Sequence, residues 1–234
     1  MDNGEYRMRE ISIVIPALNE SDGIEKTVKA IPRTELNNMG YEVHIIVADN
    51  GSTDGTAELA RKAGAEVVFE PSHGYGRAYK AGFAYAKGDI IATADADATY
   101  PVEDIPRLIT ILELEKLDFL TTNRLSSIDR DAMSFRNRLG NAILTLTMNI
   151  LFGMHIKDSQ SGMWIFKRNI LDKLMLKSNT PLSQEIKIEA CHIVKCRWKE
   201  VDIKYKPRMA EAKLGSWKVG LGNLLHLIKK RIVR

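Results

Sequence analysis

The chain has 234 residues, of which 44% are hydrophobic and 27% are charged, and it contains two cysteines. These values are typical of a globular protein, and they exclude a disordered chain, a collagen-like fibre and a disulfide-stapled miniprotein. The net charge of +4 is unevenly distributed, because residues 1–117 carry 12 Lys and Arg against 20 Asp and Glu, whereas residues 118–234 carry 22 against 10. An acidic half suits metal ligands, and a basic half suits an anionic partner.

The first 120 residues alternate short apolar runs with helical patterns. In chain order they predict strand 11–15, helix 20–31, strand 43–48, helix 53–63, strand 66–69, helix 75–86 and strand 90–94. Pro16 is expected to end the first strand. Continuous apolar strands separated by helices indicate an α/β fold, with a mostly parallel, Rossmann-like sheet flanked by helices. Such sheets bind ligands at the carboxyl ends of their strands.

The second half of the chain is less regular. Residues 139–156 carry no formal charge, and their Asn, Thr and Gly residues favour a buried or interfacial helix pair over a membrane span. Residues 217–234 place apolar side chains on one helical face and carry no acid, which predicts a basic amphipathic helix. This helix either lies on an anionic bilayer or packs on the domain. The polar, charged first ten residues predict no signal peptide, and the cysteine content favours a reducing compartment.

Acidic side chains follow the fourth predicted strand. Asp95 and Asp97 are two residues apart, so on an extended backbone their carboxylates point the same way. Together they can bind one hard divalent cation and link it to phosphate oxygens. Further polar clusters follow the first two strands, at Asn19-Glu20 and at residues 49–52. The sequence therefore predicts a metal-assisted phosphate site at this edge of the sheet.

Five motifs, IPALNE, ADNGSTDGT, GYGRAYKAGF, DADATYP and DSQSGMWIF, occur in this order along the chain. With them the sequence resembles the inverting family-2 nucleotide-sugar glycosyltransferases of GT-A fold, and among these the dolichyl- and polyprenyl-phosphate glucose and mannose synthases. The resemblance implies one catalytic domain over residues 1–216, with a donor-binding half at 1–120 and an acceptor-binding half at 121–216. The basic helix 217–234 would follow it.

The resemblance also implies roles for residues of the donor site. Pro16, Asn19 and Glu20 would line the nucleotide pocket, Asp49 would hold the base or ribose, and Gly76, Lys80, Asp95 and Ala96 would lie along the nucleotide. Asp95 and Asp97 would bind Mg²⁺ or Mn²⁺, with Asp97 beside the diphosphate as a catalytic residue. Two positions depart from the family pattern: Asn50 replaces the second Asp of the commoner D-D-G-S run, and Thr99 stands where mannose synthases often carry Gln.

On the acceptor side, Arg124, Arg136 and Arg138 resemble the arginines that bind a lipid phosphate. Arg208 and Lys213 resemble a cationic loop that closes over the diphosphate, and with Arg124 and Arg136 they are the further catalytic candidates. A phosphate monoester has its second pKa near ~6, so at neutral pH it is already a nucleophile that needs positioning by Arg. A hydroxyl acceptor would need a general base, and Asp158 or Glu185 could serve.

The resulting expectation is a metal-dependent hexosyltransferase. It would transfer a sugar with inversion from a nucleotide-diphosphate sugar, UDP-sugar in preference to GDP-mannose, to a polyprenyl or dolichyl phosphate. Its partners would be these two substrates and a membrane surface, with the protein peripheral on the cytoplasmic face. The leading alternative is a soluble glycosyltransferase that acts on a saccharide or protein hydroxyl. A sugar nucleotidyltransferase is disfavoured because no Gly-rich signature follows the first strand, and nucleic acid is not expected because the basic residues lack interleaved aromatic residues.

Overall fold

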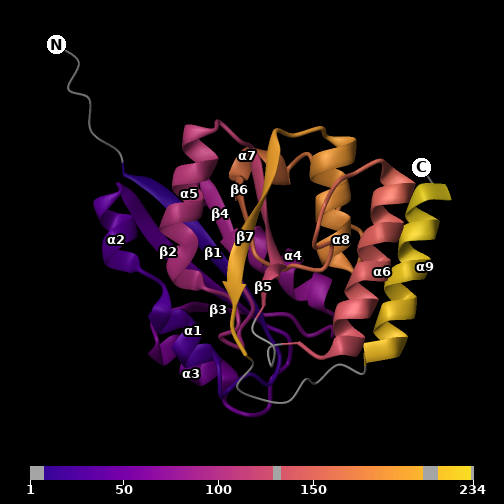
Figure 1. Ribbon diagram of the computed structural model, residues 1–234. Helices are drawn as coiled ribbons and strands as arrows, with labels where there is room; N and C mark the ends of the chain where they lie inside the picture. Colours follow the sequence, from indigo (N-terminus) through magenta and orange to yellow (C-terminus); the bar gives the residue numbers. More distant parts are fainter. Residues whose placement is uncertain (1–7, 129–132, 208–215, 233–234) are drawn as a thin grey trace.

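The computed structural model describes residues 8–128, 133–207 and 216–232 (Figure 1). The strands are β1 (Arg9–Ala17), β2 (Tyr41–Asp49), β3 (Glu66–Phe69), β4 (Ile90–Thr93), β5 (Phe119–Ile128), β6 (Trp164–Lys167) and β7 (Trp198–Tyr205). The helices are α1 (Ile24–Ala30), α2 (Arg33–Asn38), α3 (Thr56–Lys62), α4 (Tyr75–Tyr85), α5 (Ile105–Leu114), α6 (Phe135–Phe152), α7 (Arg168–Leu171), α8 (Leu182–Lys187) and α9 (Ser216–Ile232), with short helical turns η1 (Val102–Asp104) and η2 (Ile188–Ile193).

The seven strands form one sheet in the order β3-β2-β1-β4-β6-β5-β7. Strands β1 to β4 are parallel to one another, and β5 is parallel to β7. Among the strands of the described residues, only β6 is antiparallel to the strands on either side of it, β4 and β5. The prediction of a mostly parallel α/β sheet is therefore confirmed.

Apolar residues alternate between the two faces of the sheet, as strand geometry requires. On one face Ile13 and Ile15 of β1 pack with residues of α1, α2, α3 and α5. On the other face Val14 of β1 packs with Tyr79 and Phe83 of α4 and with residues of α7 and α8. Helices thus cover both faces, and the carboxyl ends of β1, β2 and β4 meet at one edge of the sheet.

Pro16 does not end the first strand, contrary to expectation. Strand β1 continues to Ala17, and Pro16 lies opposite Ala48 of β2. The Val14 carbonyl accepts from the Ala94 backbone amide, next to β4, and the Ala17 carbonyl accepts from the Asn50 backbone amide, next to β2. Because backbone groups alternate in direction along a strand, the Pro16 nitrogen, which carries no hydrogen, faces β4. Because the paired part of β4 ends opposite Val14, no ladder hydrogen bond is lost there.

Residues 139–156 were expected to form a helix pair, but they belong mainly to one helix, α6. Ser134 caps its first turn by accepting from the Asn137 amide, and Gly153 ends it in the left-handed conformation. Helix α9 packs beside α6 (Figure 1), with Leu227 buried in the same cluster as Met148. Among the described residues, no helix is long and apolar enough to cross a bilayer.

We predict that Gly82 is required for the contact between α4 and β1. A Cβ at this position would lie 2.4 Å from Cγ1 of the buried Val14. The Gly82→Ala variant should therefore lose about 1–3 kcal/mol of unfolding free energy in urea titrations. In α6 a Cβ at Gly140 would meet nothing within 4 Å. The Gly140→Ala control should instead gain up to about 1 kcal/mol from helix propensity, and equal effects would contradict the steric explanation.

Candidate active site

The loops after β1 and β2 hold each other in place. Asn19 adopts a left-handed backbone conformation, its amide nitrogen donates to Ser52 Oγ at 2.9 Å, and its side-chain oxygen accepts from the Thr53 amide at 2.8 Å. Asp49, which ends β2 and is buried, accepts from the Ser52 amide at 3.3 Å. Asn19 and Asp49, both predicted to bind the nucleotide sugar, therefore flank one loop, residues 50–55. Pro16 of β1 lies opposite Ala48 of β2, just before this loop, and the Glu20 backbone amide donates to Thr56 Oγ1, just after it.

Asn50 organises the neighbouring segment through its side-chain amide. Its Nδ2 donates to the carbonyls of Glu70 at 2.9 Å and Ser72 at 2.8 Å, while Oδ1 accepts from the Gly74 amide at 2.7 Å. A carboxylate cannot donate these two bonds. The departure from the D-D-G-S run therefore has a structural role here, in addition to removing one negative charge.

The two carboxylates after β4 are held by neighbouring hydroxyl groups. Asp97 accepts from the Thr99 hydroxyl at 2.6 Å and from the Thr99 amide at 3.1 Å, across Ala98, which has a φ of 60°. Asp95 accepts from the Tyr75 hydroxyl at 3.0 Å. A left-handed Ala is an uncommon, strained conformation of the kind found at functional sites. Thr99 thus orients Asp97 through a direct hydrogen bond.

The start of α4 packs against a segment from the second half of the chain. The Gly76 amide donates to the Asn179 carbonyl at 2.8 Å, and Lys80 Nζ donates to Asn179 Oδ1 at 3.2 Å. A Cβ on Gly76 would lie 2.6 Å from the Ser178 carbonyl oxygen. Ala96 is buried, and its carbonyl accepts from the Thr27 hydroxyl, so it joins the site to α1 through the backbone.

The residues after β4 suit a divalent cation. No three His, Cys, Asp or Glu side chains converge on a metal-sized site within the described parts of the chain. Mg²⁺, however, is commonly held by one or two carboxylates together with substrate phosphates and water. Asp95 and Asp97 supply two such oxygen ligands at the carboxyl edge of the sheet, so this donor set fits a hard cation shared with a diphosphate.

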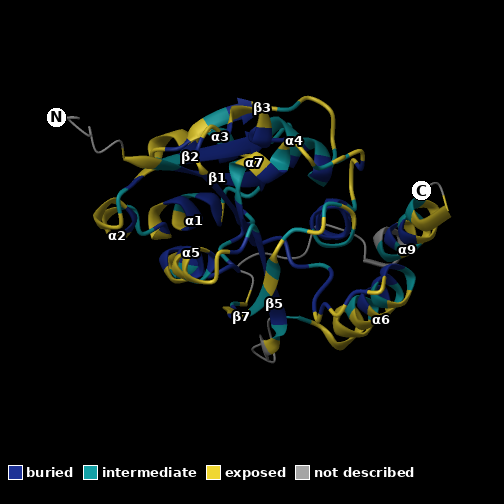
Figure 2. Ribbon diagram, turned by 90° about the horizontal axis from the view of Figure 1, so that it is seen from above, coloured by how far each residue is buried: buried dark blue, intermediate teal, exposed yellow. Residues whose placement is uncertain are grey.

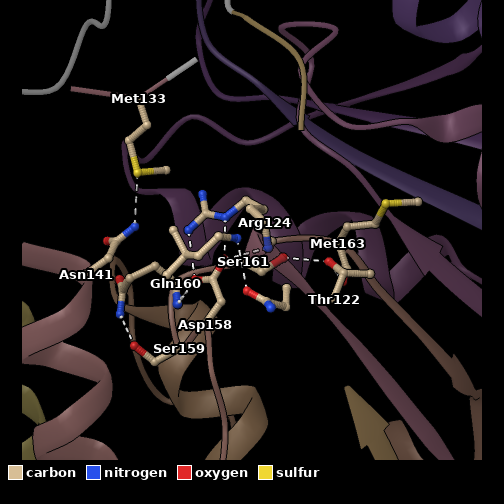
Figure 3. A network of polar contacts seen from close by, with 12 residues as sticks. Thr122, Arg124, Met133, Asn141, Asp158, Ser159, Gln160, Ser161 and Met163 are labelled. Carbon is tan, nitrogen blue, oxygen red and sulfur yellow. Dashed lines mark hydrogen bonds and ion pairs between the residues drawn. The ribbon is translucent and has the colours of Figure 1, made fainter. Parts of the chain in front are cut away.

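Arg124 of β5 forms a buried ion pair with Asp158 (Figure 3). The guanidinium donates from Nε to Oδ2 at 2.7 Å and from Nη2 to Oδ1 at 3.0 Å, and the Tyr205 ring centroid lies 5.3 Å from its central carbon. The buried Lys187 donates to the Asp158 carbonyl at 2.7 Å. Burial raises the pKa of Asp158, but the charge of Arg124, its hydrogen bonds and the charge of Lys187 together outweigh this effect, and the pKa falls to about 2.

Tyr205 contacts both Arg124 and Tyr100. Its ring packs edge-on against Tyr100 at 5.3 Å, in addition to its contact with Arg124. Burial raises the pKa of Tyr205, and the charges of Asp97 and Asp95 raise it further, whereas Arg124 lowers it. Arg124, Asp95 and Asp97 therefore all lie within electrostatic range of the Tyr205 phenol.

The sequence reasoning missed three residues with clear roles at this site: Tyr75, Lys187 and Tyr205. Tyr75 lies within the recognised GYGR motif, so its position was visible although its bond to Asp95 was not. Lys187 and Tyr205 lie outside the motifs, and only the fold brings them to Arg124. Both are buried polar residues, and their burial cannot be recognised from a single sequence.

The remaining acceptor candidates are placed differently. Arg136 and Arg138 are exposed in the first turn of α6. Glu185 is buried and paired with Lys230 of α9 at 2.8 Å. Arg208 and Lys213 lie outside the described residues. The structure thus brings Arg124 and Asp158 together, keeps Glu185 at the α9 contact, and presents Arg136 and Arg138 to solvent.

Comparison with known proteins agrees with this architecture. The family model "Glycosyl transferase family 2" matches residues 12–175. The chain is 30% identical over 210 residues to a dolichyl-phosphate hexose transferase of Haloferax volcanii, covering 90% of this chain and 89% of that protein. It is 33% identical over 213 residues to the hexosyltransferase Agl6 of the same organism, covering 90% of this chain but spanning only 51% of that relative.

Solved structures show the same fold. A glucosyl-3-phosphoglycerate synthase of Mycobacterium tuberculosis, in complex with Mn²⁺, UDP-glucose and phosphoglyceric acid, superimposes with a TM-score of 0.76 at 22% identity, covering 95% of this chain and 79% of that one. The sheet order, the helices on both faces and the extent of the family match lead to one conclusion. The chain belongs to glycosyl transferase family 2, is a glycosyltransferase enzyme, and has the GT-A fold.

Proposed function

We propose that this enzyme transfers a hexose with inversion from a nucleotide-diphosphate sugar to a polyprenyl or dolichyl phosphate, and that it does so as a peripheral protein at the cytoplasmic face of a membrane. UDP-sugars are the favoured donors, with GDP-mannose as the second choice. Relatives named for dolichyl-phosphate and hexose transfer support the reaction class.

The donor would bind across the carboxyl ends of β1, β2 and β4. Asp49 would hold the base or ribose, Pro16, Asn19 and Glu20 would line the nucleotide pocket, and Gly76 and Lys80 would follow the diphosphate. Asp95 and Asp97 would hold Mg²⁺ or Mn²⁺, which would offset the charge that develops on the nucleoside diphosphate as it leaves. Hydrogen bonds from Tyr75 and Thr99 fix the two carboxylates before the donor arrives.

The state of the two candidate bases supports a phosphate acceptor over a hydroxyl. Asp158 is occupied by Arg124 and has a pKa of about 2, far below the range of an effective general base at neutral pH. Glu185 is occupied by Lys230 and the Ser178 amide. A phosphate monoester needs no base, only cations that position it for in-line attack on the anomeric carbon. In this proposal Arg124, Arg136, Arg138, Arg208 and Lys213 serve that purpose.

One observation favours a lipid over a soluble phosphate: α6 and α9 both expose large apolar side chains. The exposed parts of the two helices are the yellow segments of their ribbons in Figure 2. The exposed positions of α6 from residue 139 onward are all apolar. The apolar face consists of Phe135, Leu139, Ile143, Leu146 and Ile150 on α6 and Leu221, Leu225, Ile228 and Ile232 on α9.

The charges around this face suit an anionic membrane. Neither α6 nor α9 contains an Asp or Glu, and Arg136 and Arg138 lie at the start of α6 while Arg231 lies in the last turn of α9. Two copies of such a face would repel each other, whereas anionic lipid headgroups attract it. A face of this kind inserts shallowly into the interface, beside the place where a lipid phosphate would reach Arg136.

The reaction itself is tested by transfer of labelled sugar from UDP- and GDP-sugars to a polyprenyl phosphate, with Mn²⁺ or Mg²⁺ and with EDTA. We expect a charged sugar lipid that forms only with metal. Asp97→Asn should lower turnover by about 10²–10³-fold, because it removes a charged ligand beside the leaving group. Asp104→Asn, which removes an exposed carboxylate seven residues later, should leave turnover unchanged. If sugar were transferred to a saccharide hydroxyl and none to the lipid, the proposal that a lipid phosphate is the acceptor would be wrong.

Membrane docking is tested by flotation with phosphatidylglycerol-containing vesicles that hold no polyprenyl phosphate. Leu146→Glu on α6, at a side chain 61% exposed, should weaken binding about tenfold because a charge enters the apolar face. Leu114→Glu on α5 is the matched control, at a side chain 78% exposed, and should bind like the wild type. Vesicle binding that Leu146→Glu leaves intact would exclude this face as the docking surface.

The Arg124–Asp158 pair predicts a characteristic pH dependence of stability. The pKa of Asp158 is about 2 in the fold against an ordinary 3.8, so its stabilisation is complete above about pH 4 and disappears as the pH falls through 2. Asp158→Asn should cost about 3–5 kcal/mol at pH 7, because it leaves the buried Arg124 uncompensated. In chemical denaturation the difference from wild type should shrink below pH 4. A constant difference between pH 7 and pH 2 would contradict the pKa, and Asp104→Asn should cost less than about 1 kcal/mol throughout.

A further inference from the structure

Lys230 of α9 turns inward, away from the apolar face of α6 and α9. Its Nζ lies 2.8 Å from Glu185 Oε1 and 2.9 Å from Glu189 Oε1. The lysine side chain is 9% exposed, and the side chains of the two glutamates are 2% and 1% exposed. One cation from the last turn of α9 therefore holds two carboxylates, from α8 and η2, inside the protein.

The same two carboxylates hold the segment that precedes α8. Glu185 Oε2 accepts from the Ser178 amide at 2.7 Å, and Glu189 Oε2 accepts from the Met175 amide at 3.3 Å. A third contact comes directly from α9, where His226 Nε2 lies 3.3 Å from Ser178 Oγ. Residues 175–178 are thus fixed to α9 through Glu185 and Glu189 as well as through His226.

This segment continues into the wall of the donor site. Asn179 accepts from the Gly76 amide through its carbonyl and from Lys80 through its side chain. The backbone contact is tight, because a Cβ on Gly74 would lie 2.6 Å from the Asn179 carbonyl oxygen. Between these glycines lies Tyr75, whose hydroxyl donates to Asp95. A shift of residues 178–179 would therefore move the start of α4 and the hydroxyl that orients Asp95.

The electrostatics make Lys230 the necessary member of this connection. Two buried carboxylates repel each other and lose hydration, so a shared cation stabilises them side by side. Burial raises the pKa of Glu185, but the hydrogen bonds from Lys230 and from the Ser178 amide and the charge of Lys230 together hold the pKa below its usual range. Without the cation, the two carboxylates would repel each other and move apart, and residues 175–178 would move with them.

We propose that Lys230 is a positioning residue for nucleotide-sugar binding: through Glu185, Glu189 and residues 175–179 it fixes the start of α4 against Asp95. The inference rests on the proposed function only for the identity of the ligand. It also means that the helix bearing half of the apolar face supports one wall of the donor site.

The test compares Lys230→Met with Lys230→Arg in the full chain. Calorimetry with UDP and Mn²⁺ should give a Kd about tenfold higher for Lys230→Met, and Lys230→Arg should restore it to within about twofold of wild type, since Arg can bind both carboxylates. In turnover assays the KM for the nucleotide sugar should rise in parallel, while the KM for polyprenyl phosphate changes less than twofold. Lys229→Met, which removes the same charge from an exposed neighbouring position, should leave the Kd unchanged.

Hydrogen exchange without any ligand makes the connection testable independently of the reaction. Lys230→Met should speed amide exchange in residues 74–80 as well as 175–180, with β5 unchanged. If that variant is too unstable, Lys230→Met combined with Glu189→Gln keeps the net charge of the buried cluster and should show the same pattern. Unchanged exchange at 74–80 in the folded variants would overturn the proposal, as would equal loss of affinity in Lys229→Met. Altered exchange in a protein that binds no nucleotide would leave the structural connection from Lys230 to α4 standing, but it would refute the proposed function and with it the role in nucleotide-sugar binding.

Discussion

Residues 158–162 are held in place by a charged pair, Arg124 and Asp158, that is almost entirely out of water. Asp158 accepts two bonds from the Arg124 side chain and one from its backbone amide, and its own carbonyl accepts from Lys187. At the other end of the segment, Gly162 accepts from the Tyr79 and Thr93 hydroxyls and donates to Tyr100. A buried pair of this kind contributes less to net stability than to specificity, but its disruption is costly. The segment it fixes thus connects Arg124 of β5 with Tyr79 of α4 and Thr93 of β4.

Much of the fold follows from the sequence because each of the first four strands contains a run of apolar residues and helical segments separate them. The type and approximate bounds of these strands were predictable from that pattern alone. The errors occurred where tertiary context decides the outcome. Pro16 stays in β1 because its nitrogen, which has no hydrogen to donate, faces β4 at a point where β4 is no longer paired with β1. The antiparallel β6 could not be anticipated either, since its direction depends on which gap in the sheet it fills and not on its own residues.

The candidate site was predictable where residues follow strand ends, as at Asn19, Asp49, Asp95 and Asp97. Such positions are fixed by chain connectivity, and the motifs mark them directly. Residues brought in from distant elements were not predictable, because a buried Tyr205 or Lys187 has no local signature. Asp158 and Glu185 show that the sequence also cannot tell whether a predicted acid is free to act as a base. Both are acids in suggestive places, and only the fold shows that each is already bound to a cation.

Asn50 has a consequence for how this enzyme can change during evolution. Its side chain donates to two carbonyls and accepts from one amide in residues 70–74, so the shape of that loop depends on an amide group at position 50. A single mutation to the aspartate of the commoner D-D-G-S run would add a negative charge after β2 and at the same time remove both donated bonds. We therefore expect Asn50→Asp to need compensating changes in residues 70–74 before that loop keeps its shape. Whether a loop from a homologue can be exchanged into the chain should accordingly depend on the residue at position 50.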